Sequence, residues 1–206
     1  MTPEGSPTVP FAAPEGAQIP SHCGPFLGPV NFPSLAPRFV LVALPKTARS
    51  PAGRAKVREA LVGILSAWAA CPVRLEETHR GPHVPTLIRG QRVFVSVTYS
   101  ADTAWMALGL EAAIGVDAVN LAECDDWQDV AAVYFGEPRT SAISATPDPK
   151  QTFALEWATL EARCKQAGMP LRENAAPLPT TTYRNVLDQT VLAVAFEPDK
   201  TAVLRR

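Results

Sequence analysis

The sequence lacks a net charge of either sign, and it lacks a long apolar run. Its 19 basic and 20 acidic side chains nearly balance, with no dense Lys/Arg block, so the electrostatic signature of a nucleic-acid-binding protein is missing. No apolar stretch approaches the roughly 20 residues that cross a bilayer. The first residues also lack the basic start and apolar core of a signal peptide. We therefore expect a cytoplasmic protein that binds neither nucleic acid nor membrane.

Paired cysteines are also missing. The four cysteines are widely separated and form no C-x-x-C motif, which argues against a zinc site, a redox motif or a disulfide scaffold. A chain of 206 residues that is 47% hydrophobic can bury about 70% of its unfolded surface, so a core can form without such cross-links. This composition is typical of a globular protein with one domain or two small ones.

Proline, in contrast, is abundant at the start of the chain. Residues 1–37 contain nine prolines, and proline at that density prevents both helix formation and strand pairing. We predict an extended, proline-rich arm over these residues. It could be disordered, or its apolar residues, such as Phe11 and Phe26, could anchor it along the folded body.

The rest of the chain alternates between strand and helix patterns. Short β-branched or alternating runs predict strands, and apolar residues at three- and four-residue steps predict helices. The predicted strands are 38–44, 92–97, 103–110, 113–119 and 190–196, and the predicted helices are 50–68, 127–135 and 151–167. Residues 137–150 are rich in proline, serine and threonine and predict a loop. The order strand, helix, strands occurs once before residue 110 and again after it, which indicates an α+β protein with similar halves at 38–110 and 111–206.

Three polar features stand out from these patterns. Asp117 lies at the end of an apolar strand, where an ionised carboxylate needs a partner or a metal, although it could simply cap the strand end. Glu161 and Lys165 lie four residues apart on the long predicted helix, where a solvated ion pair is the simpler interpretation. Arg54 and Arg58 form a small basic patch on the first helix, which could also be a solvated helix face.

Taken together, two of these segments resemble the signature of the 4'-phosphopantetheinyl transferase superfamily. They are I114-G-V-D117 and W157-A-T-L-E161-A-R-C-K165, with Glu161 44 positions after Asp117. In that family the first block is an apolar-Gly-apolar-Asp strand end, and the second is an aromatic-x-x-Lys-Glu-Ala/Ser-x-x-Lys helix. Asp117, Trp157, Glu161, Ala162 and Lys165 match these blocks position for position.

The resemblance extends over residues 38–196. V95-S-V-T-Y-S100 is similar to the family's Asn-Leu-Ser-His-Ser segment, and V133-Y-F-G-E137 is similar to the segment before its signature helix. The length resembles the Sfp type, in which one monomeric chain holds two similar halves. Each half of that type is a small, mostly antiparallel sheet packed on a long helix, and coenzyme A binds between the halves.

The resemblance also implies a reaction and a role for each residue. The family transfers phosphopantetheine from coenzyme A to a serine of an acyl or peptidyl carrier protein. Asp117 and Glu161 would bind Mg²⁺, a cation that prefers a few carboxylate oxygens together with water and phosphate. Glu161, Lys165 and Asp117 would then be the catalytic residues, and either Glu161 or a metal-bound water would accept the serine proton. The coenzyme A contacts would come from Arg58, Arg54, Arg80, Tyr99 and Lys165.

Three positions depart from the family pattern. Tyr99 replaces the histidine of the Ser-His-Ser segment, Val119 replaces a second carboxylate, and Leu160 replaces the lysine before the signature glutamate. Two functions therefore stay open, a divergent transferase or a protein that binds coenzyme A or a carrier protein without turnover. A third possibility is a different α+β domain in which Asp117 and Glu161 lie far apart.

Overall fold

A computed structural model describes residues 39–44, 46–78, 81–88, 90–173, 180–187 and 189–196 of the chain. Its strands are β1 (Phe39–Leu44), β2 (Glu76–Thr78), β3 (Gly81–His83), β4 (Val93–Ser100), β5 (Thr103–Leu110), β6 (Ile114–Asn120), β7 (Thr181–Leu187) and β8 (Thr190–Phe196). Its helices are α1 (Pro51–Ala69), α2 (Trp127–Phe135), α3 (Glu137–Ser144) and α4 (Pro149–Ala167), and a short 3₁₀ turn spans Leu121–Glu123. Within the described ranges, none of the helices is long and apolar enough to cross a membrane.

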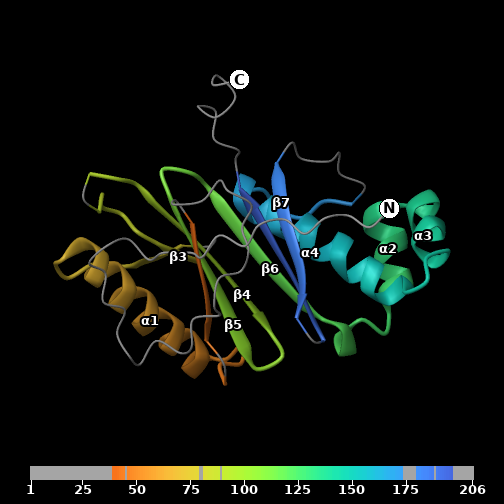
Figure 1. The fold of residues 1–206 in the computed structure, drawn as a ribbon, viewed down its shortest axis with the longest axis horizontal. Helices are drawn as coiled ribbons and strands as arrows, with labels where there is room; N and C mark the ends of the chain where they lie inside the picture. The colour runs from red at the N-terminus through yellow and green to blue at the C-terminus, as the bar shows by residue number, and fades with distance from the viewer. Residues whose placement is uncertain are drawn as a thin grey trace, which may run out of the picture.

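Two three-stranded antiparallel sheets form the centre of the molecule (Figure 1). The first has the order β1-β5-β4 and the second the order β6-β8-β7. In both sheets the strand that comes last in the chain lies in the middle. We call β1, α1, β4 and β5 the first sheet unit, and β6, α4, β7 and β8 the second. The strands β2 and β3 form a separate hairpin.

Helix α1 covers the outer face of the first sheet. The Ser50 side chain accepts a hydrogen bond from the Gly53 amide at 3.0 Å, and a proline follows at the first helical position, so the helix has a favourable start. The large side chains of Leu61, Ile64 and Leu65 are fully buried against the sheet. Burial of such side chains stabilises the fold by about 2 kcal/mol each.

Helix α4 covers the outer face of the second sheet with much smaller side chains. Asp148 caps the start of the helix at the Gln151 amide, and Gly168 ends it in the left-handed conformation at φ 63°. Ala154, Ala158 and Ala162 recur every four residues and are completely buried against the sheet. Alanines on this face let the helix axis approach the strands closely.

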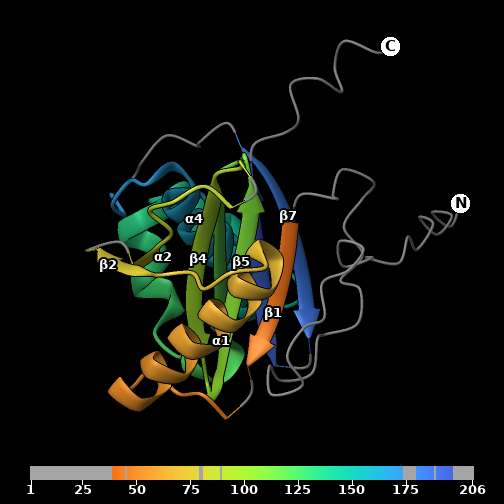
Figure 2. The same ribbon diagram turned by 90° about the vertical axis from the view of Figure 1, so that its left-hand side faces the viewer.

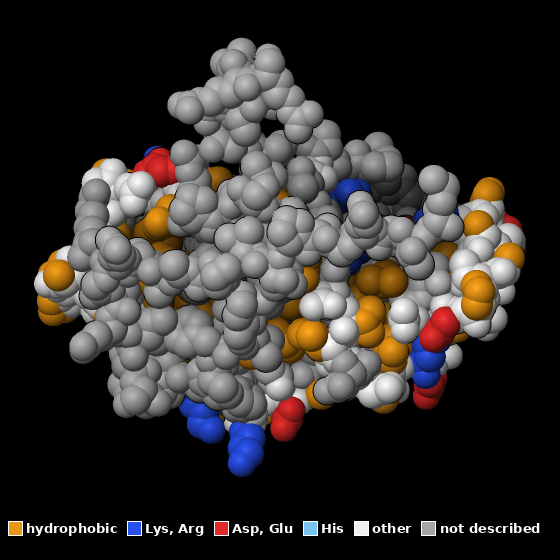
Figure 3. Space-filling view, in the orientation of Figure 1, with side chains coloured by type: hydrophobic (Ala, Val, Ile, Leu, Met, Phe, Trp, Pro, Cys, Tyr) orange, Lys and Arg blue, Asp and Glu red, His pale blue; other side chains and the backbone are white. Residues whose placement is uncertain are grey.

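The inner faces of the two sheets pack against each other. Leu41, Trp105, Val116, Val194 and Phe196 belong to the apolar layer between them. The molecule is therefore layered as helix α1, first sheet, second sheet and helix α4, and the two helices lie on opposite sides (Figures 1 and 2). Figure 3 shows side chains of both charge signs scattered around the rim of one face, with hydrophobic side chains visible near its middle.

The two sheets meet where strand β4 runs beside strand β6. The Ser96 hydroxyl of β4 accepts a hydrogen bond from the Val116 amide of β6 at 3.0 Å. Two residues further along β4, the Thr98 hydroxyl donates to the Asp117 carboxylate at 2.9 Å. Side chains of β4 thus satisfy polar groups at the edge of β6, a place where a backbone ladder would otherwise be expected.

The α+β class and the predicted strands and helices are confirmed, to within a few residues at the ends. The predicted loop at 137–150 is wrong, because it contains helix α3 and the start of α4. Pro138 fits the first turn of α3, the Thr140 hydroxyl donates back to the Gly136 carbonyl, and Ile143 is buried. Strand β7 was not predicted, because its mostly polar sequence resembles a loop. The proline-rich arm lies outside the described residues.

Candidate active site

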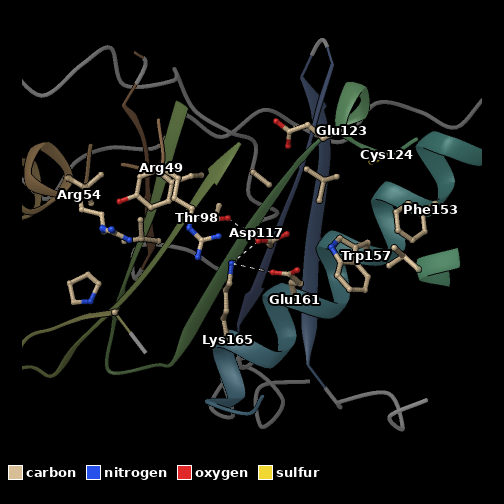
Figure 4. Close-up of a pocket in the computed structure, with 18 of the residues that line it drawn as sticks. Arg49, Arg54, Thr98, Asp117, Glu123, Cys124, Phe153, Trp157, Glu161 and Lys165 are labelled. Atoms are coloured by element: carbon tan, nitrogen blue, oxygen red, sulfur yellow. Dashed lines mark hydrogen bonds and ion pairs between the residues drawn. The ribbon is translucent and has the colours of Figure 1, made fainter. Parts of the chain in front are cut away.

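A cavity of about 540 Å³ opens between the two sheet units. Residues from α1, the β2–β3 hairpin, β4, β6, α2 and α4 all line it. Figure 4 shows Arg49 and Arg54 on one side and Trp157, Phe153 and Cys124 on the other, with Asp117, Glu161 and Lys165 between them. The cavity thus has a basic end, an acidic middle and an aromatic end.

Asp117, Glu161 and Lys165 form what we call the acid–lysine cluster. The Lys165 ammonium lies 2.6 Å from the Asp117 Oδ1 atom and 3.7 Å from the Glu161 Oε2 atom. It also donates to the Val116 carbonyl at 3.2 Å. Glu161 and Lys165 reach the same point because they are one helical turn apart on α4. Two carboxylates from different elements therefore converge on one ammonium group.

A glycine makes this convergence possible. At Gly115 of β6, a Cβ atom would lie 1.9 Å from the Ala162 carbonyl oxygen of α4 and 2.5 Å from the Gln166 amide nitrogen. Any side chain there would push the helix away from the strand. Gly115 lies two positions before Asp117, and Ala162 directly follows Glu161. The glycine and alanine of the two sequence blocks therefore set how close the acidic residues come.

Asp117 is fixed from two directions. Its side chain is only 5% exposed, and its Oδ1 atom accepts hydrogen bonds from both Lys165 and Thr98. A buried carboxylate is tolerated only when such partners compensate for its lost hydration. Because both partners are side chains of other elements, Asp117 does more than cap the end of its own strand.

Glu161 has an unusual pKa. Burial, followed by the nearby negative charge of Asp117, raises the pKa of the Glu161 carboxyl to about 7, while Lys165 acts in the opposite direction. Near neutral pH this carboxyl group therefore exists in both protonation states. A carboxyl group with this pKa can accept or release a proton under ordinary conditions.

The arginine end of the cavity, formed by Arg49, Arg54 and Arg58, can bind anions. Arg58 forms an exposed ion pair with Glu77 on β2. Burial raises the pKa of the Tyr99 hydroxyl, opposed by the positive charges of Arg54 and Arg49, so this side chain is a neutral hydrogen-bonding group beside the arginines. Guanidinium groups bind phosphates well because their donors match phosphate oxygens in pairs.

The aromatic end of the cavity is rich in apolar side chains, although Glu123 and Asp126 also line the cavity. Phe153 and Trp157 lie on one face of α4 with their rings stacked, at a centroid separation of 6.0 Å and an angle of 19°. Val119 and Val130 line the same part of the cavity. This end can hold an uncharged part of a ligand whose anionic part lies among the arginines.

The structure brings most of the predicted site residues together. Asp117, Glu161, Lys165, Arg54, Arg58 and Tyr99 all line the one cavity. The interpretation in which Asp117 and Glu161 lie far apart is wrong, because both contact Lys165. Arg80 lies outside the described residues, although the adjoining Gly81 and Pro82 line the cavity.

Sequence reasoning missed two residues of the site. Arg49 lines the cavity from the position just before the α1 cap, and Thr98 holds the Asp117 carboxylate. A signal for Thr98 was present in the sequence, because Ser96, Thr98 and Ser100 place hydroxyl groups on one face of a strand and all three are buried. For Arg49 the signal was weaker, since a helix pattern does not include the residue before its cap.

The acid–lysine cluster fits a divalent cation that takes most of its ligands from elsewhere. In the described part of the chain there is no group of three or more His, Cys, Asp or Glu side chains that could hold a metal. The cluster nevertheless offers two carboxylates that already converge on a positive charge. Mg²⁺ is commonly held by one or two carboxylates, with water and substrate phosphates completing its shell.

Comparison with known proteins does not assign the chain to a family. The sequence matches no protein-family model and no curated protein sequence. What the protein does must therefore be inferred from the residues of the cavity and from their arrangement.

Proposed function

We propose that this protein is a 4'-phosphopantetheinyl transferase that moves phosphopantetheine from coenzyme A to a serine of an acyl or peptidyl carrier protein. One observation carries the proposal. The two sequence blocks that resemble this family meet at Asp117, Glu161 and Lys165, in a cavity that three arginines also line. If the resemblance were due to chance, there would be no reason for Asp117, Glu161 and Lys165 to lie together in the folded protein.

The strand order supports the same proposal. Sheets β1-β5-β4 and β6-β8-β7 share one order and one antiparallel pairing, and each has a long helix on its outer face. Such an arrangement is expected of the Sfp type, with halves at 38–110 and 111–206 in a single monomeric chain. The cavity between the units corresponds to the place where that type binds coenzyme A. We propose that the protein acts as a monomer in the cytoplasm.

The cavity suggests how its residues would serve this transfer. The serine oxygen attacks the phosphorus next to pantetheine, the diphosphate P–O bond breaks, and adenosine 3',5'-bisphosphate leaves. Arg49, Arg54 and Arg58 would hold the nucleotide phosphates. Lys165 would neutralise charge that develops on the diphosphate oxygens.

The serine proton needs an acceptor. Glu161 suits this role, because its pKa of about 7 lets it be ionised before the transfer and protonated after it. Asp117 and Glu161 are the residues that would hold Mg²⁺, which would supply further charge stabilisation at the diphosphate. Thr98 would keep the Asp117 carboxylate oriented.

A second function, binding of coenzyme A or a carrier protein without turnover, is favoured by one observation. Val119 lines the cavity where the family has a second carboxylate, and Tyr99 lines it where the family has a histidine. Each lost contact to a charged group costs about 1.5 to 3 kcal/mol if nothing replaces it. Arg49, which the sequence blocks do not include, could replace one of them. Leu160 is not among the described residues that line the cavity.

The test is intact-mass analysis of several apo carrier proteins incubated with this protein, coenzyme A and Mg²⁺. We expect a mass gain of one phosphopantetheine on at least one carrier. We expect no gain with Asp117→Ala or Glu161→Ala. Arg139→Gln, which removes a surface ion pair away from the cavity, serves as the matched control and should retain activity.

Two other outcomes would be informative. Coenzyme A binding by calorimetry with no modified carrier would favour the binding protein over the transferase. No modification, together with no binding of either coenzyme A or a carrier protein, would remove both functions.

A further inference from the structure

The Lys165 side chain occupies the point where the two carboxylates of the cluster converge. Its Nζ atom contacts the Asp117 carboxylate at 2.6 Å, the Val116 carbonyl at 3.2 Å and the Glu161 carboxylate at 3.7 Å. An ammonium group has three donors, and here three oxygen atoms surround it. The side chain is one third exposed, so it can also reach the cavity.

A divalent cation bound by Asp117 and Glu161 would need the same oxygen atoms. Two positive charges cannot share one small group of oxygens without strong repulsion. We infer that Lys165 is a built-in counter-ion that competes with a divalent cation for Asp117 and Glu161, and that a phosphate ligand in the cavity draws Lys165 away. The cation and the phosphate ligand then bind with positive cooperativity.

The surroundings of Lys165 permit this exchange. Its flexible four-carbon stem rises from α4 on the side that lines the cavity. A ligand phosphate held by the arginine end would give the ammonium a new partner as strong as the carboxylate it leaves. Thr98 stays bonded to Asp117 throughout, so the carboxylate keeps its orientation for the incoming cation.

Competition of this kind has a thermodynamic consequence. The cation alone must displace Lys165, and the phosphate ligand alone finds Lys165 held by two carboxylates. Binding of either ligand therefore lowers the free energy needed to separate Lys165 from the carboxylates when the other ligand binds. By linkage, the cation raises the affinity for the phosphate ligand by the same factor as the phosphate ligand raises the affinity for the cation. Only the choice of coenzyme A as the phosphate ligand rests on the proposed function.

The first experiment measures Mn²⁺ binding by electron paramagnetic resonance, without coenzyme A, for the wild-type protein and the Lys165→Met variant. Met keeps the length of the side chain and removes its charge. We expect Lys165→Met to bind Mn²⁺ on the order of tenfold more tightly. Lys150→Met, on the same helix but paired with Asp125 outside the cavity, should bind like the wild type. Equal or weaker Mn²⁺ binding by Lys165→Met would overturn the inference.

Repeating the titration with coenzyme A tests the cooperativity. In the wild type, saturating coenzyme A should raise Mn²⁺ affinity by about the same factor, after correction for Mn²⁺ bound by coenzyme A in solution. In Lys165→Met the enhancement should be smaller. An enhancement unchanged by the substitution would contradict a role for Lys165.

A second measurement uses the unsubstituted protein, in case the variant does not fold. An amine-acylating reagent is applied with and without Mn²⁺, and modification of Lys165 and Lys150 is compared by peptide mass analysis. We expect Mn²⁺ to increase modification of Lys165 relative to Lys150, because the cation frees the ammonium. Unchanged or reduced modification would overturn the inference.

These results separate the inference from the proposed function. If Mn²⁺ competes with Lys165 but coenzyme A neither binds nor reacts, the competition stands and the transferase proposal fails. If carrier proteins are modified while Lys165→Met leaves Mn²⁺ affinity unchanged, the transferase proposal stands and this inference fails.

Discussion

The two sheet units share a strand order but use different side chains where helix meets sheet. In the first unit, α1 packs through Leu61, Ile64 and Leu65. In the second, α4 packs through Ala158 and Ala162 and their helical neighbours, and a glycine of β6 touches its backbone. Large side chains hold α1 away from its strands, while small ones let α4 lie directly on them.

The difference explains why the acid–lysine cluster lies in the second unit. Charges on a helix can meet a carboxylate on a strand only if the two backbones are close. The first unit keeps its helix farther away and contributes the arginines at the start of α1. The two units therefore share a strand order but contribute different groups to the cavity. The closely packed second unit contributes the acid–lysine cluster, and the first unit contributes the arginine end.

The largest effect should follow from a methyl group placed in the tight interface. Gly115→Ala directs its Cβ into the backbone of α4, and we expect a loss of about 3 kcal/mol or more in the free energy of unfolding. Gly53→Ala in the first unit also meets a backbone carbonyl, that of Ala48 at 2.0 Å, but Ala48 lies in the segment between β1 and α1 and not in a packed helix. Its expected cost is smaller by about 1 kcal/mol, because Gly53 lies in helix α1 and alanine has a higher helix propensity than glycine.

Urea denaturation of both variants measures this difference. Equal losses for Gly115→Ala and Gly53→Ala would mean that the β6–α4 approach is no tighter than the start of α1. The comparison between the units would then lose its structural basis.

The next effect concerns the arginine end of the cavity. Arg49→Gln should weaken coenzyme A binding by about tenfold, because a contact from a charged donor to phosphate contributes about 1.5 kcal/mol or more. The free energy of unfolding should change little. Calorimetric titration measures the affinity, with Arg139→Gln on α3 as the control. Equal affinities of the two variants would place the anion elsewhere than at the arginine end.

A smaller effect should appear in the pH dependence of stability. The pKa of Glu161 rises from 4.5 to about 7 on folding, so the folded protein keeps a proton that the unfolded chain releases. This contribution is fully present below pH 4.5 and is lost as the pH rises through 7. Between pH 6 and 8, the wild type should lose roughly 1.4 kcal/mol more stability than Glu161→Gln. Parallel stability curves in urea would show that Glu161 does not carry this proton.

The smallest effect concerns the exposed ion pair between Arg58 and Glu77. Glu77→Gln should change the free energy of unfolding by about 0.5 kcal/mol or less, because both side chains are well exposed. It should also strengthen coenzyme A binding slightly by releasing Arg58 toward the cavity. Thermal denaturation and calorimetry measure the two quantities. A large loss of stability would show that this pair holds the hairpin on α1.

Much of the fold could be predicted from the sequence, because most elements carry a strong pattern. The apolar spacing of α1 and the Gly168 stop of α4 are local signals that survive in the folded protein. Helix α3 and strand β7 were missed, since their polar residues gain their structure from capping bonds and sheet pairing that no local pattern contains.

The site was predictable in its residues but not in its contacts. The two sequence blocks predicted that Asp117 and Glu161 belong to one site. Their shared contact with Lys165 depends on how α4 packs against β6. Thr98 could not have been assigned to Asp117, because β4 and β6 belong to different sheets and are brought together only by the packing of those sheets. Long-range packing of this kind leaves no trace in neighbouring residues.

The contact between β4 and β6, where the two sheets meet, indicates where the chain could be cut into two fragments. In the described structure each sheet completes its backbone pairing within its own unit, and the contacts between the sheets are an apolar layer and side-chain hydrogen bonds. A cut between Leu110 and Ile114 would leave both sheets whole. We expect the two fragments, produced separately, to reassemble into one molecule, so that complementation of the fragments could report on any event that brings them together.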